Sequence, residues 1–440
     1  MASAIGDGFL AGIPLTASTD QVIDRICPGP DACYYLTAGV ELLDTGRISP
    51  ANYWILNLWP PGVAVLSALY VAVARLGIWL PLAAGMINIA VWTLVLSAWY
   101  RFLRPRVGPV VSLGAVLLVA VGQPMREWYL GVGLFYVESI SVALLLSAVL
   151  QAIRASSAPT RRSAIVRGSA SGALFAAAAY LRAPYETAAL VLTAATVVVF
   201  GFRIVQAVRL RSRGQLRRAL RSSLVLISVV VAFHAFTMPW RVIAATEVRP
   251  GNIVWSTAGS DFWPQHWIPS SYLEEKGHYF LLYGLMNVPC RLEPAKCLDI
   301  FMIEVQAAQP YSPHDGEGLE MSEFRTASLQ ALLHNPVDWV ALKSFGFTRF
   351  WFASGPGFEL IENGLLLTLL GLVIFWRPKA LGEAGWLIFF SLAIAIVGSS
   401  FLVHFETRYL YPLKSIAPVV GALRMPWILS RFRPHTEPID

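Results

Sequence analysis

The sequence predicts an all-helical protein that crosses a membrane about nine or ten times and carries loop and cap regions on the outer side. The chain is 56% hydrophobic and 14% charged, whereas soluble proteins carry about a quarter charged residues. Apolar stretches of about 18 to 25 residues follow one another along it, the length that a helix needs to span a bilayer. The connecting segments hold clusters of arginine, which gather in cytoplasmic loops of membrane proteins.

The first 79 residues are expected to lie on the outer side of the membrane. Residues 1–18 are too short and too polar to span it, since a spanning helix needs about 20 apolar residues, and they lack the basic region of a signal peptide. Residues 60–77 are apolar but short. We expect them to form a juxtamembrane or re-entrant helix with Pro61 in its first turn.

The spanning segments begin after residue 79, and their orientation in the membrane can be tested with the positive-inside rule. Five basic clusters, around Arg104, Arg161, Arg213, Arg377 and Arg431, lie between or after the segments. Nine spans place all five on one side and the N-terminal loop on the other. The predicted spans are 80–102, 108–124, 131–153, 165–182, 186–208, 223–246, 361–377, 385–403 and 409–430.

The chain therefore divides into four parts. Residues 1–79 form the outer N-terminal region, and 80–246 form a transmembrane bundle. Residues 247–338 form an extracytoplasmic insert rich in Pro, Gly, Trp and acids. Residues 339–440 hold the last transmembrane helices, preceded by an interfacial helix within 334–353, where Lys and Arg alternate with Trp and Phe.

Four cysteines fall in two close pairs, Cys27 with Cys33 and Cys290 with Cys297. Local pairing is the simplest of the three connectivities that four cysteines allow. It requires an oxidising compartment, which agrees with an outer position for both segments. Four free thiols are the alternative. No histidine sits at the spacing of a zinc site.

One polar stretch precedes the apolar helices. It reads Cys27-Pro-Gly-Pro-Asp31-Ala-Cys33-Tyr34-Tyr35-Leu-Thr-Ala38 and continues through Gly46 to Pro60-Pro61-Gly62. This order, Asp-x-x-Tyr-Tyr-x-x-Ala, a glycine and Pro-Pro-Gly, resembles the first extracytoplasmic loop of the GT-C glycosyltransferases. That superfamily includes protein O-mannosyltransferases and lipid A aminoarabinose transferases. Its pattern places a transmembrane helix before this loop. Either the start of the present sequence is set downstream of the true one, or the chain departs from the family here.

The resemblance implies an enzyme of the bacterial plasma membrane with its site on the extracytoplasmic face. It would move a hexose or pentose from a polyprenyl-phosphate carrier to a glycan, lipid or protein of the cell envelope, with inversion at the anomeric carbon. Membrane lipids would be its other partners, and nucleic acid would not be one. The sequence specifies no cofactor or metal motif, and a divalent metal stays an open alternative.

Asp31 is the predicted catalytic base. Sugar transfer to a hydroxyl needs a carboxylate that takes the proton as attack occurs, and Asp31 lies beside the predicted bilayer. A helix-capping role is the alternative, and Asp20 and Asp24 are rivals in the same region.

Glu138 is the second catalytic candidate, because an ionisable group in the outer half of an apolar helix is costly and often functional. It lies where many GT-C sequences carry Thr-Glu or Ser-Glu. The alternative is a structural hydrogen bond between helices.

Three cations are predicted to bind the donor phosphate. Arg182 resembles the arginine of a Leu-x-Arg-Pro element, Arg408 resembles an Arg-Tyr pair near the end of GT-C sequences, and Lys414 lies near it on the last helix. Arginine can hold a phosphate through two parallel hydrogen bonds. The alternative is that these side chains reach lipid headgroups.

The remaining candidates are predicted to bind substrate. Trp240 and Arg241 resemble a Pro-Trp-x-x-Arg-Asn element, although the arginine follows the tryptophan directly. His404 and Glu406 make a short outer loop unusually polar. The predicted substrate-binding set is Tyr34, Tyr35, Trp240, Arg241, His404 and Glu406.

Two other functions fit parts of the pattern. A transporter or carrier of lipid-linked sugar would also need apolar helices and arginines for a phosphate. Transporters more often show internal repeats and broken helices in the middle of the membrane, and the sequence shows neither. A GT-C relative that has lost catalysis is the third interpretation.

Overall fold

The computed structural model describes residues 14–26, 31–131, 134–209, 213–248, 347, 351–352, 358–376, 378–402 and 407–431. Every regular element within these ranges is a helix, which confirms the predicted all-helical class. All but the first two residues of the predicted extracytoplasmic insert, 247–338, lie outside the described residues.

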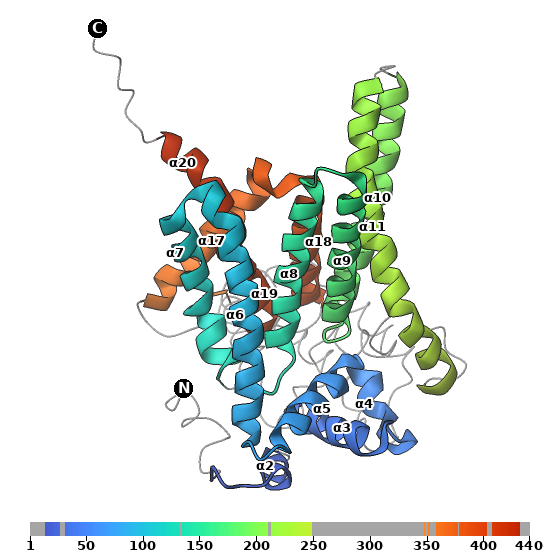
Figure 1. Ribbon diagram of the computed structural model, residues 1–440, viewed down its shortest axis with the longest axis vertical. Coiled ribbons are helices and arrows are strands. Elements are labelled where there is room, and N and C mark those ends of the chain that lie inside the picture. The colour runs from blue at the N-terminus through green and yellow to red at the C-terminus, as the bar shows by residue number, and fades with distance from the viewer. Residues whose placement is uncertain are drawn as a thin grey trace, which may run out of the picture.

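Five elements precede the long helices and lie together at one end of the molecule (Figure 1). We call this end the α3 end. The elements are α2 (Thr19–Ile26), α3 (Ala32–Thr45), the short turn η1 (Pro50–Asn52), α4 (Tyr53–Leu58) and α5 (Gly62–Ala74). The expected short helix in 60–77 is therefore α5. Its 13 residues would extend about 20 Å, which is too short to cross a bilayer.

The bundle that follows is built from helices that run up and down in sequence order. They are α6 (Leu80–Val107), α7 (Pro109–Ala120), the π-helix η2 (Pro124–Tyr129), α8 (Glu138–Ser156), α9 (Arg161–Ala179), α10 (Pro184–Arg209), α11 (Arg213–Ile243) and η3 (Ala244–Val248).

The C-terminal part adds α17 (Phe358–Phe375), η5 (Lys379–Leu381), α18 (Gly382–Leu402), α19 (Thr407–Gly421), η6 (Ala422–Arg424) and α20 (Met425–Arg431). Each of the nine predicted spans thus overlaps a helix, and the ninth, 409–430, is divided among α19, η6 and α20.

Five helical segments within the described residues are long and apolar enough to cross a membrane: Leu80–Val107, Glu138–Ser156, Pro184–Gln206, Ser223–Val248 and Lys379–Gly398. The predicted spans on α7 and α17 correspond to shorter apolar helices, a group that also includes α5. The predicted spans on α9 and α19 fall in neither group. The chain is thus a helical membrane protein. Segment 131–153 differs most from expectation, because turns precede Glu138 and the helix begins only at that residue.

The turns between consecutive helices alternate between the α3 end and the opposite end. Figure 1 places the end of α6 with the start of α7, the end of α8 with the start of α9, and the end of α10 with the start of α11 at the end opposite α3. Basic residues occur at each of these turns, including Arg106, Arg154, Arg161 and Arg209. We call this the basic end. The helix directions therefore place the first three of the five predicted arginine clusters at one end.

The positive-inside rule assigns the basic end to the cytoplasm, and this leads to a topology prediction. A reporter inserted beside Cys33 should be extracytoplasmic, and one beside Gln265 should agree with it, whereas one beside Arg213 should be cytoplasmic. Paired enzymatic reporters active on opposite sides of the membrane would measure this. A cytoplasmic signal at residue 33 would remove the proposed active-site loop from the donor side.

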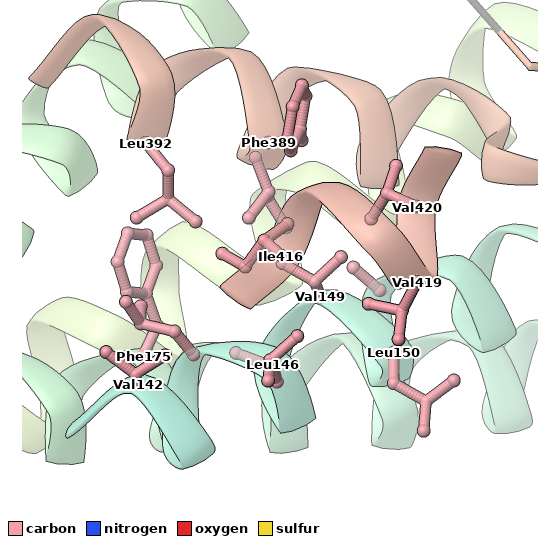
Figure 2. Packing of buried hydrophobic residues seen from close by; sticks show 14 of the residues in the cluster. Val142, Leu146, Val149, Leu150, Phe175, Phe389, Leu392, Ile416, Val419 and Val420 are labelled. Atoms are coloured by element: carbon pink, nitrogen blue, oxygen red, sulfur yellow. The ribbon is translucent and has the colours of Figure 1, made fainter. Parts of the chain in front are cut away.

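The main core surrounds α8, which is buried along almost its whole length. Figure 2 shows Val142, Leu146 and Val149 of α8 facing side chains of other helices. Those other residues are Phe175 of α9, Phe389 and Leu392 of α18, and Ile416, Val419 and Val420 of α19. Because lipid does not drive helices together as water does, close packing of this kind supplies much of the bundle's stability.

The C-terminal part joins this core through two aromatic residues of the predicted interfacial segment 334–353. Most of that segment lies outside the described residues. Trp351 is fully buried, and Phe347 stacks on it with ring centroids 5.9 Å apart. The indole of Trp351 donates to the carbonyl of Asn363 in α17 at 2.9 Å. The end of this segment is therefore fixed inside the bundle.

Helices α3 and α5 pack closely because of a glycine. A Cβ at Gly39 would lie 2.6 Å from backbone atoms of Ser67 and Ala68, so any side chain there would force the helices apart. At the other end of the pair, Arg75 forms an ion pair with Asp44, and this guanidinium holds the pKa of the Asp44 carboxyl below its usual value. The pair is exposed to solvent and therefore contributes little.

Candidate active site

Asp31 lies at the position immediately before α3 and is half-buried. Its carboxylate makes no capping hydrogen bond to the helix. The helix begins directly after Asp31, as the capping alternative predicts. The side-chain hydrogen bond that a cap requires is not made. The rival acids Asp20 and Asp24 lie on α2 and are exposed.

The paired tyrosines after Asp31 belong to a row of aromatic rings. Tyr34 stacks on Trp59 with centroids 6.0 Å apart, and Tyr35 meets the same indole edge-on at 5.3 Å. Tyr35 is buried and also meets Tyr136 edge-on at 5.9 Å. Tyr136 lies two residues before Glu138. The row therefore joins the Asp31 segment to the segment that carries the second predicted carboxylate.

The Pro60-Pro61-Gly62 element contacts the element that carries Arg182. The amide of Gly62 donates to the carbonyl of Tyr180 at 2.9 Å. A Cβ at residue 62 would lie 2.5 Å from that carbonyl oxygen, so the approach requires glycine. Two motifs separated by more than a hundred residues of sequence thus meet at the α3 end.

Glu138 and Arg182 form a buried ion pair. Arg182 Nη1 lies 2.7 Å from Glu138 Oε1, and the side chains are 14% and 1% exposed. Glu138 lies in the first turn of α8, where the helix dipole favours a negative charge. Burial of the carboxylate is therefore compensated by a cation and by the helix. The pairing unites one predicted catalytic residue with one predicted phosphate ligand.

A second buried ion pair was not predicted from the sequence. Arg241 Nη2 lies 2.6 Å from Glu186 Oε1, with side-chain exposures of 15% and 3%. The same guanidinium lies 3.3 Å from His234 Nδ1, and His234 Nε2 lies 3.3 Å from the Thr193 hydroxyl. Glu186 belongs to the first turn of α10, so Arg241 joins α11 to α10. Its predicted neighbour Trp240 is half-buried on α11.

Lys414 lies inside the bundle, about 10 Å along α19 from its first residue. It is 1% exposed. Its ammonium donates to Gln123 Oε1 at 2.7 Å and to the carbonyl of Trp351 at 2.8 Å. The predicted contact of Lys414 with a phosphate stays a prediction.

Asn88 connects three further elements at the same end of the bundle. This fully buried side chain accepts from the Tyr70 hydroxyl of α5 at 2.9 Å. Its amide donates to the carbonyls of Tyr129 and Leu134 at 3.3 Å each. Burial raises the pKa of the Tyr70 phenol above its usual range, so the hydroxyl remains a donor. Sequence reasoning missed Asn88, although a lone amide within a long apolar helix is a signal for such a contact.

Several predicted residues lie outside the described ranges. They are Cys27, Cys290, Cys297, His404 and Glu406. Arg408 lies in the first turn of α19, and its side chain is outside the described set. Cys33 is disulfide-bonded. Its partner is one of the three cysteines outside the described residues, so the predicted local pairing stays a prediction.

Peptide mapping under non-reducing conditions should recover Cys27 joined to Cys33 and Cys290 joined to Cys297. Four alkylatable thiols in the native protein would contradict the pairing. Because the loop between Cys27 and Cys33 is short, its closure contributes little chain entropy. We therefore expect Cys27→Ser to lower activity, through a looser Asp31 segment, more than it lowers thermal stability.

Within the described residues, no group of three or more His, Cys, Asp or Glu side chains is placed to hold a metal ion. The insert, which carries several of the chain's histidines and acids, lies outside those residues. A divalent metal therefore stays an open alternative.

Comparison with known proteins gives little further information. No protein-family model matches the sequence, and no curated protein matches it. Among solved structures, the chain is similar to ArnT from Cupriavidus metallidurans in the apo state, with a TM-score of 0.30 and 14% sequence identity. The likeness covers 92% of this chain and 76% of that one. At this TM-score it decides neither the fold family nor the activity.

Proposed function

We propose that the protein is a membrane glycosyltransferase that moves a sugar from a polyprenyl-phosphate carrier to a cell-envelope acceptor at the extracytoplasmic face. The observation that carries the proposal is the meeting of four separate sequence elements at the α3 end. They are the start of α3 with Asp31, the Pro60–Gly62 turn, the start of α8 with Glu138, and the Tyr180–Arg182 turn. Each was singled out from the sequence by its resemblance to an element of the GT-C glycosyltransferases.

The contacts between these elements are specific. Gly62 reaches Tyr180 through a backbone hydrogen bond, Tyr35 reaches Tyr136 through an aromatic contact, and Arg182 reaches Glu138 through a buried ion pair. A set of solvated loop charges would have no reason to converge in this way. Convergence of carboxylates and an arginine at the end of a membrane bundle favours a site that handles a charged, lipid-linked substrate.

In this proposal Asp31 takes the proton from the acceptor hydroxyl as its oxygen forms a bond to the anomeric carbon. The bond from that carbon to the carrier's phosphate oxygen breaks at the same time, so a single displacement inverts the centre. The leaving phosphate gains negative charge, which Arg182 and Arg408 stabilise. A guanidinium has five N–H donors, so Arg182 can serve Glu138 and a phosphate together.

The remaining predicted residues supply binding in this scheme. Trp240, Arg241, His404 and Glu406 would contact sugar or acceptor, and the Tyr34 and Tyr35 rings would support the Asp31 segment. Tyr35 is buried and Tyr34 is half-buried, so Tyr34 is the better placed of the two to reach a ligand.

The test is transfer of labelled sugar by the purified protein in detergent or nanodiscs. A panel of polyprenyl-phosphate hexose and pentose donors would be offered with cell-envelope extract as acceptor. Labelled product that requires both donor and protein supports the proposal. If instead reconstituted vesicles move labelled lipid-linked sugar between leaflets without forming product, the protein is a carrier and the enzyme proposal fails.

A further inference from the structure

We propose that Lys414 is a positioning residue: the central cation of a charge cluster, buried at Gln123, Glu362 and Lys414, that fixes the chain segment leading to Glu138. The cluster consists of Gln123, Arg126, Glu127, Glu362 and Lys414, and we call it the Lys414 cluster. The inference rests on the proposed function for what the positioned segment does. It gives Lys414 a role within the protein in place of a direct contact with the donor phosphate.

The surroundings of Lys414 are protein groups from several elements. The ammonium is held by the side chain of Gln123, which precedes η2, and by the carbonyl of Trp351, which precedes α17. The rings of Trp351 and Tyr411 lie with centroids 5.5 and 5.8 Å from the same nitrogen. Such rings stabilise a desolvated cation, so the site is built to hold the ammonium where it is.

Gln123 connects the Lys414 ammonium to two carboxylates. Its side-chain amide donates to Glu127 Oε2 at 2.9 Å, and the same oxygen accepts from the Tyr411 hydroxyl at 3.2 Å. Its backbone amide donates to Glu362 Oε1 at 2.7 Å. Glu362 is buried, and its other oxygen lies 3.5 Å from Arg126 Nη1. Hydrogen bonds therefore connect Lys414, Gln123, Glu127 and Glu362, and an ion pair adds Arg126.

The formal charges within the cluster balance. Lys414 and Arg126 contribute two positive charges, and Glu127 and Glu362 contribute two negative charges. Burial makes an uncompensated charge costly. Loss of the ammonium alone should therefore disturb the carboxylates, whereas loss of one carboxylate at the same time should restore neutrality.

A short path joins the cluster to Glu138. Glu127 lies within η2, which ends at Tyr129, and the Tyr129 hydroxyl bonds with Ser415 of α19 at 3.2 Å. Asn88 binds the carbonyls of both Tyr129 and Leu134. Leu134 is four residues before Glu138. Movement of η2 would thus move the segment that begins α8 and holds the partner of Arg182.

The experiment compares the purified variants Lys414→Met, Glu127→Gln and the double variant. Methionine keeps much of the length of lysine without its charge, and glutamine keeps the shape of glutamate. Lys379→Met is the matched control, because Lys379 is exposed at the opposite end of the molecule. Apparent Tm in detergent and the kcat and KM of sugar transfer would be measured for each.

Lys414→Met should lower kcat about 10- to 100-fold, since a small misplacement of reacting groups costs that much, and should lower the apparent Tm. The double variant should recover most of both losses, because the cluster is neutral again. Lys379→Met should match the wild type. The rescue is the decisive readout, since a phosphate ligand cannot be replaced by removing a carboxylate.

Two results would overturn the proposal. In the first, the double variant recovers its Tm but transfers sugar no faster than Lys414→Met, which makes Lys414 a direct ligand of the substrate. In the second, Lys414→Met unfolds at the wild-type Tm, which shows that the Lys414 charge does not stabilise the cluster. If the wild type transfers no sugar while the loss and rescue of Tm are observed, the cluster stands and the proposed function fails.

Discussion

Asp31→Asn should abolish most sugar transfer while it preserves the fold and the binding of the donor. The amide matches the carboxylate in size but cannot take a proton as a base, and loss of a general base costs about 10²- to 10⁴-fold in rate. Asp31 makes no side-chain hydrogen bond to cap α3, so the exchange removes no such contact. The measurement is kcat and donor Kd for the variant and the wild type.

Asp20→Asn is the matched control for this experiment. Asp20 lies on α2, in the same outer region, and its side chain is exposed. We expect the Asp20→Asn variant to transfer sugar at the wild-type rate. If Asp31→Asn keeps nearly full activity while Asp20→Asn or Glu138→Gln loses it, the base is another carboxylate and the glycosyltransferase proposal survives.

The second large effect is expected at the buried pair of Glu138 and Arg182. Arg182→Ala should weaken donor binding about 10- to 100-fold, because a hydrogen bond to a charged group contributes about 1.5–3 kcal/mol. It should also destabilise the protein, since Glu138 is 1% exposed and removing one partner of a buried pair costs about 3–5 kcal/mol. Donor Kd and apparent Tm report the two effects separately.

Arg182→Lys distinguishes the two roles. It keeps a positive charge for Glu138, so stability should largely return, but it loses the planar fork that matches a phosphate. Donor affinity should therefore remain weakened. Arg75→Ala removes an arginine from an exposed ion pair with Asp44 and should change neither quantity much. Full recovery of donor affinity in Arg182→Lys would reduce the role of Arg182 to structure.

The helices were predictable because hydropathy and charge act locally. Runs of apolar residues and their flanking arginines put every predicted span over helical residues, although 409–430 is divided among α19, η6 and α20. Segment 60–77 holds the 13-residue helix α5, and its exclusion as a span stays a prediction. Element ends were less predictable. Segment 131–153 looked continuous in composition, yet turns occupy its first part, and Glu138 begins the helix rather than lying within it.

The polar partners were not predictable from the sequence. Arg182 and Lys414 were singled out as cations, but nothing in the chain order pairs them with Glu138 or Gln123. A shared signal was nevertheless present. Glu138, Glu186 and Glu362 each lie within the first five residues of an apolar helix at the α3 end, and each accepts a hydrogen bond from another element. An acid at such a position in a sequence thus predicts a polar contact with a distant residue, such as a cation.

The hydrogen bond between Gly62 and Tyr180 has a consequence for biosynthesis. It joins the first residue of α5 to a residue about 120 positions later, a separation that makes its formation slow because a long loop must close first. During translation the α2–α5 region leaves the ribosome well before α9 has been inserted. Its docking surface is then incomplete, and the region must wait, partly exposed, for the translocon to release the later helices. A nascent chain halted shortly before residue 180 should therefore keep residues 31–74 open to protease, and one halted well past α10 should protect them.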